Sequence, residues 1–287
     1  MGVSNMKKEN IFIILGVMAV LVTGINCLNN VNESIQAEQL YNSLATQTYH
    51  LTSDVFALDD VHNTLYLGAT NRVLDKDMKK CKPISSANRV STEEKTLVVL
   101  DEYEDLYAQN NDLAGWISDG EKINYPVMKC AEDENFYLHN DFNKQESMYG
   151  ALYLSEESEI GQRGINVIYG HHMKDGSMFG SLKEYLDADY LEANKIIEID
   201  SLYEKMQYEV VAVFKSQIFM SDDDVFKYYS YKGDISEDRF NDYLNGVSEI
   251  ADYCNFEDVK YGDSLIELVT CNYHVKNGRL VVLCKKI

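Results

Sequence analysis

A cysteine and an arginine near the C-terminus have the types and spacing that acyl-transfer chemistry requires. The apolar run Leu265–Val269 leads into Thr270 and Cys271. Arg279 follows after a polar loop and starts a second apolar run. If the two runs pair as antiparallel strands, the end of one lies beside the start of the other. A guanidinium beside a thiol favours the reactive thiolate and offers fixed donors to an oxyanion. The pattern therefore predicts Cys271 as a nucleophile and Arg279 as its oxyanion partner.

A catalytic cysteine also needs a group that carries protons to and from the reacting amines. The chain has 6 histidines. His171 is the best placed, because it follows the apolar run Ile165–Tyr169 and a glycine and should emerge at a strand end. We therefore assign His171 as the general acid and base, with His172 and His274 as the nearest rivals.

Each of these residues also has an ordinary structural interpretation. A cysteine after a buried strand is usually inert packing, and an arginine at a strand start is usually a solvated charge. A histidine near a turn is more often a surface or hydrogen-bonded structural residue. Thr270 is a candidate for substrate or oxyanion contacts, and equally a β-branched strand residue. The joint arrangement of Cys271, His171 and Arg279 favours catalysis, as does the location outside the cytoplasm that the N-terminal segment described below predicts.

The chain has 6 cysteines, and no two form a CxxC pair or share the spacing of metal ligands. We therefore expect no zinc site, and thiol-based acyl transfer needs no metal or organic cofactor. The scattered spacing also argues against a disulfide framework. The spacing leaves open a single disulfide bond between two of the residues Cys81, Cys130, Cys254 and Cys284.

Composition limits the partners of the protein. The 287 residues carry a formal net charge of −21, and 45% of them are hydrophobic, so a sizeable core can form. Such an acidic surface repels nucleic acid and an anionic lipid surface alike. We expect no nucleic-acid partner.

A hydrophobic segment near the N-terminus indicates a membrane anchor. Residues 11–28 contain no charged side chain, and as a helix they would span roughly 27 Å, close to the bilayer hydrocarbon thickness. Lys7 and Lys8 precede the segment and place the N-terminus in the cytoplasm. A cleaved signal peptide is the alternative, but Ile25 and Asn26 before Cys27 do not fit a cleavage site. A core helix is disfavoured because the segment is apolar on every face.

The chain divides into four predicted parts. They are a cytoplasmic tail at 1–10, a membrane anchor at 11–28, a stalk at 29–91 with one helix near Glu33–Leu51, and a catalytic domain at 92–287.

Within the catalytic domain, a capping box and apolar spacing predict an amphipathic helix over 92–109. Short apolar runs then predict strands at 116–117, 125–128, 149–154, 165–169, 196–199, 208–219, 265–269 and 280–283. Residues 179–186 and 189–193 should be helical or turn-like, and an acidic insert at 221–258 should hold a helix at Ser236–Ile250. Together these elements predict a mostly-β domain that is a barrel or a barrel-like sandwich.

The site segments resemble the sortase family, in which TLxTC is followed by an arginine on the next strand. Leu268–Cys271 and Asn277–Arg279 carry this pattern, and Tyr169–His171 resembles the histidine segment of the family. Four further segments resemble class B sortases, and the insert before the cysteine strand matches the helix-containing connection of that class. These segments are Gly115–Ile117, Tyr125–Val127, Phe136–Leu138 and Met173–Phe179. The resemblance covers about residues 92–287 and implies a closed sortase-type β-barrel with an N-terminal helix.

Two positions depart from the family pattern. Glu267 stands where the family usually has threonine, and Asn272 follows the cysteine where some members carry an acidic residue. We therefore assign no catalytic aspartate.

The resemblance also implies an activity and partners. The substrate would be a secreted protein with a C-terminal sorting motif of the LPxTG kind, and the acceptor an amine of a peptidoglycan precursor. Cys271 would form a thioacyl-enzyme, and the enzyme would sit in the cell membrane through residues 11–28 with its catalytic domain outside. Two rivals stay open: a cysteine peptidase without transfer, and a non-catalytic anchored binding ectodomain.

Overall fold

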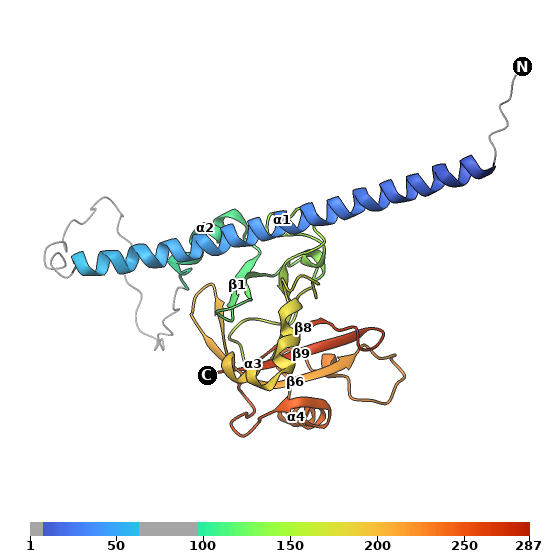
Figure 1. The fold of residues 1–287 in the computed structure, drawn as a ribbon. Coiled ribbons are helices and arrows are strands. Elements are labelled where there is room, and N and C mark those ends of the chain that lie inside the picture. Colours follow the sequence, from blue (N-terminus) through green and yellow to red (C-terminus); the bar gives the residue numbers. More distant parts are fainter. Residues whose placement is uncertain (1–7, 63–96) are drawn as a thin grey trace, which may run out of the picture.

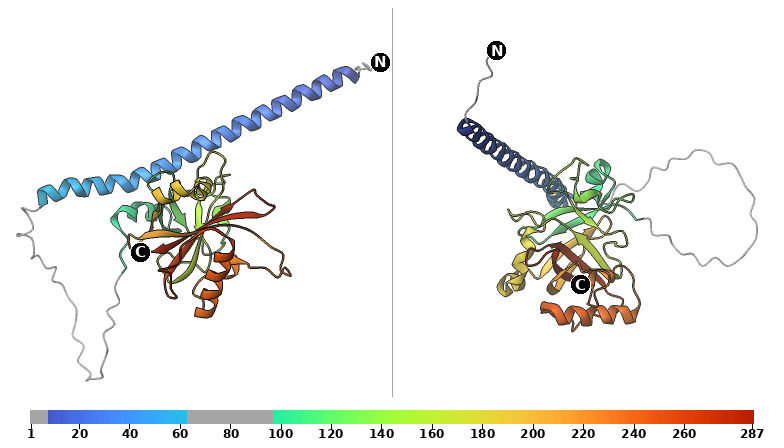
Figure 2. Two further views of the ribbon diagram at one scale, coloured as in Figure 1. Left: turned by 60° about the horizontal axis from the view of Figure 1, so that its bottom comes forward. Right: turned by 90° about the vertical axis from the view of Figure 1, so that its right-hand side faces the viewer.

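The computed structural model describes residues 8–62 and 97–287, with side chains for residues 18–48 and 97–287. A β-barrel lies between a long helix on one side and a shorter helix on the other (Figures 1 and 2). The long helix, α1, spans Lys8–His62, and its N-terminal part projects beyond the barrel. The shorter helix, α4, spans Glu237–Ile250.

Within the described residues the strands form one 9-stranded sheet in the order β5-β1-β2-β3-β4-β8-β9-β6-β7. A further pairing of β5 with β6 closes the sheet into a barrel and leaves β7 on its outer edge. The strands are β1 Leu113–Ser118, β2 Asn124–Met128, β3 Leu152–Leu154, β4 Gly164–Tyr169, β5 Ile196–Ser201, β6 Gln207–Gln217, β7 Ala251–Cys254, β8 Ser264–Cys271 and β9 Gly278–Lys286. The remaining helices are α2 Asp101–Gln109, η1 Phe136–Leu138, η2 Gly180–Leu186, α3 Ala188–Ala193 and η3 Tyr228–Ser230.

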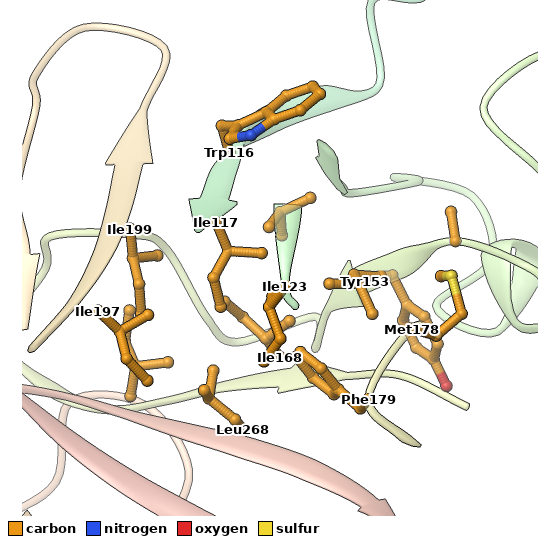
Figure 3. Packing of buried hydrophobic residues seen from close by; sticks show 14 of the residues in the cluster. Trp116, Ile117, Ile123, Tyr153, Ile168, Met178, Phe179, Ile197, Ile199 and Leu268 are labelled. Carbon is orange, nitrogen blue, oxygen red and sulfur yellow. The ribbon is translucent and has the colours of Figure 1, made fainter. Parts of the chain in front are cut away.

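The central strands β8 and β9 separate two hydrophobic cores. Alternate residues of β8 point to opposite faces, and Ile266 and Leu268 belong to the core inside the barrel. Figure 3 shows Leu268 in this core with Ile117, Ile168 and Phe179. Leu265 and Val269 pack outside, under α4. Both faces of these strands are buried, which is why their sequences are mostly apolar, with Glu267 as a buried exception in the middle of β8.

Helix α4 covers the outer face because one side of it is apolar. Phe240, Tyr243 and Val247 recur at helical spacing and are fully buried, whereas most of the side chains between them are exposed. The predicted helix in the acidic insert is therefore confirmed.

The expected closed barrel with an N-terminal helix and a helical insert is confirmed. Most of the expected strands are present, with shifted ends. The strand expected at 149–154 begins only at Leu152. Strand β7 was not expected; it is short and half-exposed at the sheet edge, so its sequence lacks a continuous apolar run.

The helices also differ from expectation. Helix α2 begins at Asp101, and its N-cap Leu100 makes no side-chain capping bond. The capping box expected at 91–94 lies outside the described residues. The helix expected near Glu33–Leu51 forms part of α1, which extends well beyond it in both directions.

The described cysteines, Cys27, Cys130, Cys254, Cys271 and Cys284, are all free thiols. Cys81 lies outside the described residues. Among the described side chains, no group of three or more His, Cys, Asp or Glu residues could hold a metal ion.

The predicted membrane anchor falls partly on described residues. Within the part of the chain that the structure describes, no helix is long and apolar enough to cross a membrane. Residues 11–17 of the predicted anchor lie outside the described side chains.

Candidate active site

Strands β8 and β9 bring the predicted nucleophile and its arginine together. In the antiparallel register Cys271 pairs directly with Arg279, and Thr270 pairs with Leu280. Cys271 is the last residue of β8 and is half-buried, as is Arg279. The loop between them closes with Asn277 at a φ of 57° and a hydrogen bond from the amide of Gly278 to the Val275 carbonyl (3.1 Å). The cross-strand neighbours predicted from the sequence are thus confirmed as neighbours.

A parallel pairing brings His171 to the same place. Strand β4 runs parallel to β8 with Tyr169 opposite Val269, so both strands end at the same edge of the barrel. The amide of Gly170 donates to the carbonyl of Val269 at 3.1 Å. The hydroxyl of Thr270 donates back to the carbonyl of Gly170 at 2.8 Å. The residue before His171 is therefore tied to the residue before Cys271.

One backbone carbonyl fixes the orientation of the His171 ring. Nε2 of His171 lies 2.7 Å from the carbonyl oxygen of Leu138, at the end of η1. A carbonyl oxygen can only accept, so Nε2 carries a proton and donates it. The other nitrogen, Nδ1, is then the one that can accept or deliver a proton during a reaction.

The two rival histidines sit differently. His172 makes an edge-on contact with the Tyr273 ring at 5.6 Å, and among the described residues its Nδ1 has no hydrogen-bond partner. Burial, with Lys183 adding to it, lowers the pKa of His172, so this ring is neutral near pH 7. His274 is exposed, and its Nδ1 lies 2.9 Å from the Asn272 side-chain oxygen. Only His171 follows directly on the β4–β8 junction.

The Arg279 guanidinium bonds to neutral carbonyl groups, so its positive charge is not neutralised by any carboxylate of the described chain segments. Its Nη1 donates to the carbonyls of Gly278 (3.0 Å) and Asn277 (3.3 Å). Among the described residues no carboxylate forms an ion pair with it. An arginine held by neutral carbonyls retains unused donors and an unneutralised charge for an anion.

Tyr153 on β3 belongs to the same region, and sequence reasoning did not single it out. Burial is the main cause that raises its pKa; among the smaller causes, the Cys271 thiol raises the pKa and the Arg279 guanidinium lowers it. In the β3–β4 pairing Tyr153 lies opposite Tyr169, the last residue of β4 and the start of the histidine segment. The ring packs on Tyr169 at 5.4 Å. Tyrosines are common along the chain, so only the fold distinguishes this one.

Glu267, the departure from the family pattern, is buried on the outer face of β8. Its carboxyl accepts a hydrogen bond from the Tyr243 hydroxyl at 2.6 Å. Burial raises the pKa of Glu267 to about 8, against smaller opposing effects of Tyr243 and Lys232. The carboxyl is therefore largely protonated at neutral pH, which removes the cost of an unpaired buried charge.

Comparison with known proteins shows which protein family has this arrangement of residues. A family model described as "Sortase domain" matches residues 119–287, which include Cys271, Arg279 and His171. The chain belongs to the sortase family. As a sortase it is a cysteine transpeptidase.

The relatives of this sortase include sortase B proteins. It is 31% identical to sortase B of Listeria monocytogenes over 66% of this chain and 75% of the relative. A Staphylococcus aureus sortase B–substrate complex superposes with a TM-score of 0.58 at 27% identity, covering 66% of this chain and 86% of that one. A sortase B complexed with triglycine superposes with a TM-score of 0.57 at 27% identity, covering 65% of this chain and 85% of that one.

Proposed function

We propose that this sortase cleaves a C-terminal sorting pentapeptide of secreted proteins and transfers them to an amine of the cell wall. Cys271 acts as nucleophile, His171 as general acid and base, and Arg279 as the oxyanion partner. The observation that carries the proposal is the joint register of β4, β8 and β9. It aligns Cys271 with Arg279 and ties the residue before His171 to the residue before Cys271.

The first half of the reaction forms a thioester. The Cys271 thiolate attacks the carbonyl carbon of the scissile peptide bond, and the electron pair of the C=O bond moves to oxygen. Guanidinium donors of Arg279 stabilise that oxyanion. When the C–N bond breaks, Nδ1 of protonated His171 gives its proton to the leaving amine. The Leu138 carbonyl holds Nε2–H throughout, so the ring does not need to turn.

The second half transfers the acyl group. The acceptor amine attacks the thioester carbonyl and loses a proton to Nδ1 of His171, and the C–S bond breaks to restore the thiolate. This step consumes no oxidant or reductant and needs no metal. Thr270 contributes indirectly, because its hydroxyl is already engaged with the Gly170 carbonyl and it holds the two active-site strands in register.

Amine dependence tests transfer against simple hydrolysis. The full chain is incubated with an LPxTG-like or an NPQTN-like peptide, with and without triglycine, and products are identified by mass spectrometry. We expect an amine-dependent ligated product with at least one peptide. Hydrolysis that is unchanged by triglycine would instead indicate a cysteine peptidase. Undiminished product from Cys271→Ala would reject the nucleophile.

We further propose that residues 11–28 anchor the protein in the cell membrane, with the catalytic domain on the outer side. The segment is free of charge, and its described large apolar side chains are exposed along α1, where the helix projects past the barrel (Figure 1). These exposed residues are Met18, Val20, Leu21, Val22, Ile25 and Leu28. Membrane fractionation of the full chain and of a chain with Leu21→Lys and Val22→Lys tests the anchor. Equal recovery of both in the soluble fraction would reject it.

A further inference from the structure

Helix α1 docks on the barrel through one face, although it lies outside the region that matches the sortase family model. Ala37, Tyr41, Leu44 and Ala45 are buried at helical spacing and join the inner core. The Tyr41 ring meets Tyr125 of β2 edge-on at 5.3 Å. Two sets of contacts lead from this docked face to His171.

The first set reaches the imidazole ring. The Tyr41 hydroxyl donates a hydrogen bond to the carbonyl of Gly150. Gly150 has a φ of 55°, and a Cβ there would lie 2.8 Å from the carbonyl oxygen of Leu138. The backbone at Gly150 therefore lies close to the Leu138 carbonyl that accepts from His171 Nε2, with no room for a side chain between them. Gly150 is therefore the backbone position through which Tyr41 comes nearest to that acceptor.

The second set reaches the backbone of the histidine. Asp175, in the loop after His171, accepts hydrogen bonds from Ser34 of α1 (3.3 Å) and from the Tyr149 hydroxyl (2.8 Å). The same loop closes through a hydrogen bond from the Phe179 amide to the His171 carbonyl at 3.0 Å. Burial alone would raise the pKa of Asp175, but the hydrogen bonds from Ser177, Tyr149 and Ser34 hold it below its usual range. The carboxylate stays charged and accepts strongly.

Among the described side chains, α1 bonds to these loops through Tyr41 and Ser34. A cavity of about 470 Å³ separates α1 from the barrel between the two sets of contacts. Its walls include Ser34 and Tyr41 of α1, and Tyr149 and Asp175 of the barrel. Because close packing is interrupted here, a small number of polar bonds determines how α1 positions the loops.

We propose that α1 is a positioning element for His171, and that Tyr41 and Asp175 are positioning residues through which it acts. The inference rests on the proposed function in one respect, the role of His171 as acid and base. Tyr41 fixes the acceptor of the ring through Gly150, and Asp175 fixes the loop that follows the histidine. Proton transfer depends steeply on the placement of the donor, so α1 raises turnover without touching the substrate.

Full-chain variants test this. Tyr41→Phe removes one hydroxyl and keeps the ring contact, and Asp175→Asn weakens the acceptor of the loop. Gln47→Ala is the matched control, because within the described part of the chain the Gln47 side chain of α1 accepts a hydrogen bond only from Gln109 of α2 (3.1 Å), away from both loops. We expect each of the two variants to lower kcat about fivefold with KM unchanged, and the control to match the wild type.

A spectroscopic readout separates this inference from the proposed function. In chains labelled with ¹⁵N-histidine, the Nε2–H of His171 should exchange slowly with solvent in the wild type and faster in Tyr41→Phe and Asp175→Asn. Wild-type kcat together with wild-type exchange in a variant that combines Tyr41→Phe with Asp175→Asn would overturn the inference. An equal loss in Gln47→Ala would also overturn it, since general loosening of α1 would then suffice. Full activity of His171→Ala would instead overturn the proposed role of His171 and leave the exchange result standing.

Discussion

The hydroxyl of Thr270 donates a 2.8 Å hydrogen bond to the carbonyl of Gly170, across the parallel junction of β8 and β4. Thr270 immediately precedes Cys271, and Gly170 immediately precedes His171. This side-chain bond therefore adds to the backbone bonds that hold together the strand ends carrying the thiol and the imidazole.

Replacing Thr270 by valine keeps the shape of the side chain and removes this bond. We expect Thr270→Val to lower kcat/KM by roughly 0.5–1.5 kcal/mol of transition-state stabilisation, because the strand ends are then held by backbone bonds alone. Steady-state kinetics with a sorting peptide and an amine measures the effect. Thr270→Ser is the control that keeps the hydroxyl and should retain most activity. Equal losses in both variants would show that the methyl packing matters and the bond does not.

Arg279 should act through its fork of donors. We expect Arg279→Ala to cost about 2.7–4 kcal/mol of transition-state stabilisation, as for other oxyanion donors. Arg279→Lys keeps the charge and loses the planar geometry, so it should recover only part of the rate. The measurement is kcat/KM for the three proteins. A wild-type value for Arg279→Ala would exclude the arginine from the reaction.

The three neighbouring histidines can be separated by substitution. His171→Ala should abolish transfer, whereas His172→Ala and His274→Ala should keep most of it, because His171 lies nearest to the β4–β8 junction and its ring is oriented by the Leu138 carbonyl. Product yield with and without amine is measured for each variant. Loss of activity confined to His172→Ala would show that the acid and base is His172 and not His171.

Glu267 should make the stability of the domain depend on pH. Its pKa is about 8 in the folded protein and near the ordinary 4.5 when unfolded. Between these values the folded state holds a proton that the unfolded state has lost. The contribution is fully present below about pH 4.5 and is lost as the pH rises through about 8. Glu267→Gln keeps an acceptor for Tyr243 and cannot ionise, so its stability should fall less over this range.

Denaturant melts at pH 5, 6.5 and 8 check this prediction about Glu267, with wild type and Glu267→Gln compared at each pH. The difference in unfolding free energy between the two proteins should change by several kcal/mol across the series, at about 1.4 kcal/mol per pKa unit. Parallel curves for the two proteins would mean that Glu267 is not protonated in the fold.

The sequence carried most of the information about the barrel and part of that about the site. The two terminal strands are readable because both of their faces are buried, and their pairing follows from the short loop between Cys271 and Arg279. The position of His171 depends on the parallel β4–β8 pairing, which joins segments about a hundred residues apart and has no local signal. Closure of the barrel by β5 and β6 is non-local in the same way.

Other features could not be read from the sequence for a different reason. Glu267 is visible in the sequence as a polar departure, but its protonation depends on Tyr243, which reaches it from α4. The docking of α1 depends on which face of a long helix meets the barrel, and its moderate apolar spacing at Ala37, Tyr41 and Leu44 is common in helices. The bond from Tyr41 to Gly150 joins two residues that carry no recognisable motif.

The most direct test of the account is to trap the acyl-enzyme. The full chain is mixed with a sorting peptide in the absence of amine, quenched in acid, and analysed by intact-mass and peptide mass spectrometry. The account predicts an acyl adduct on Cys271 that disappears when triglycine is added and does not form in Cys271→Ala. An adduct on any other residue, or transfer by Cys271→Ala, would contradict it.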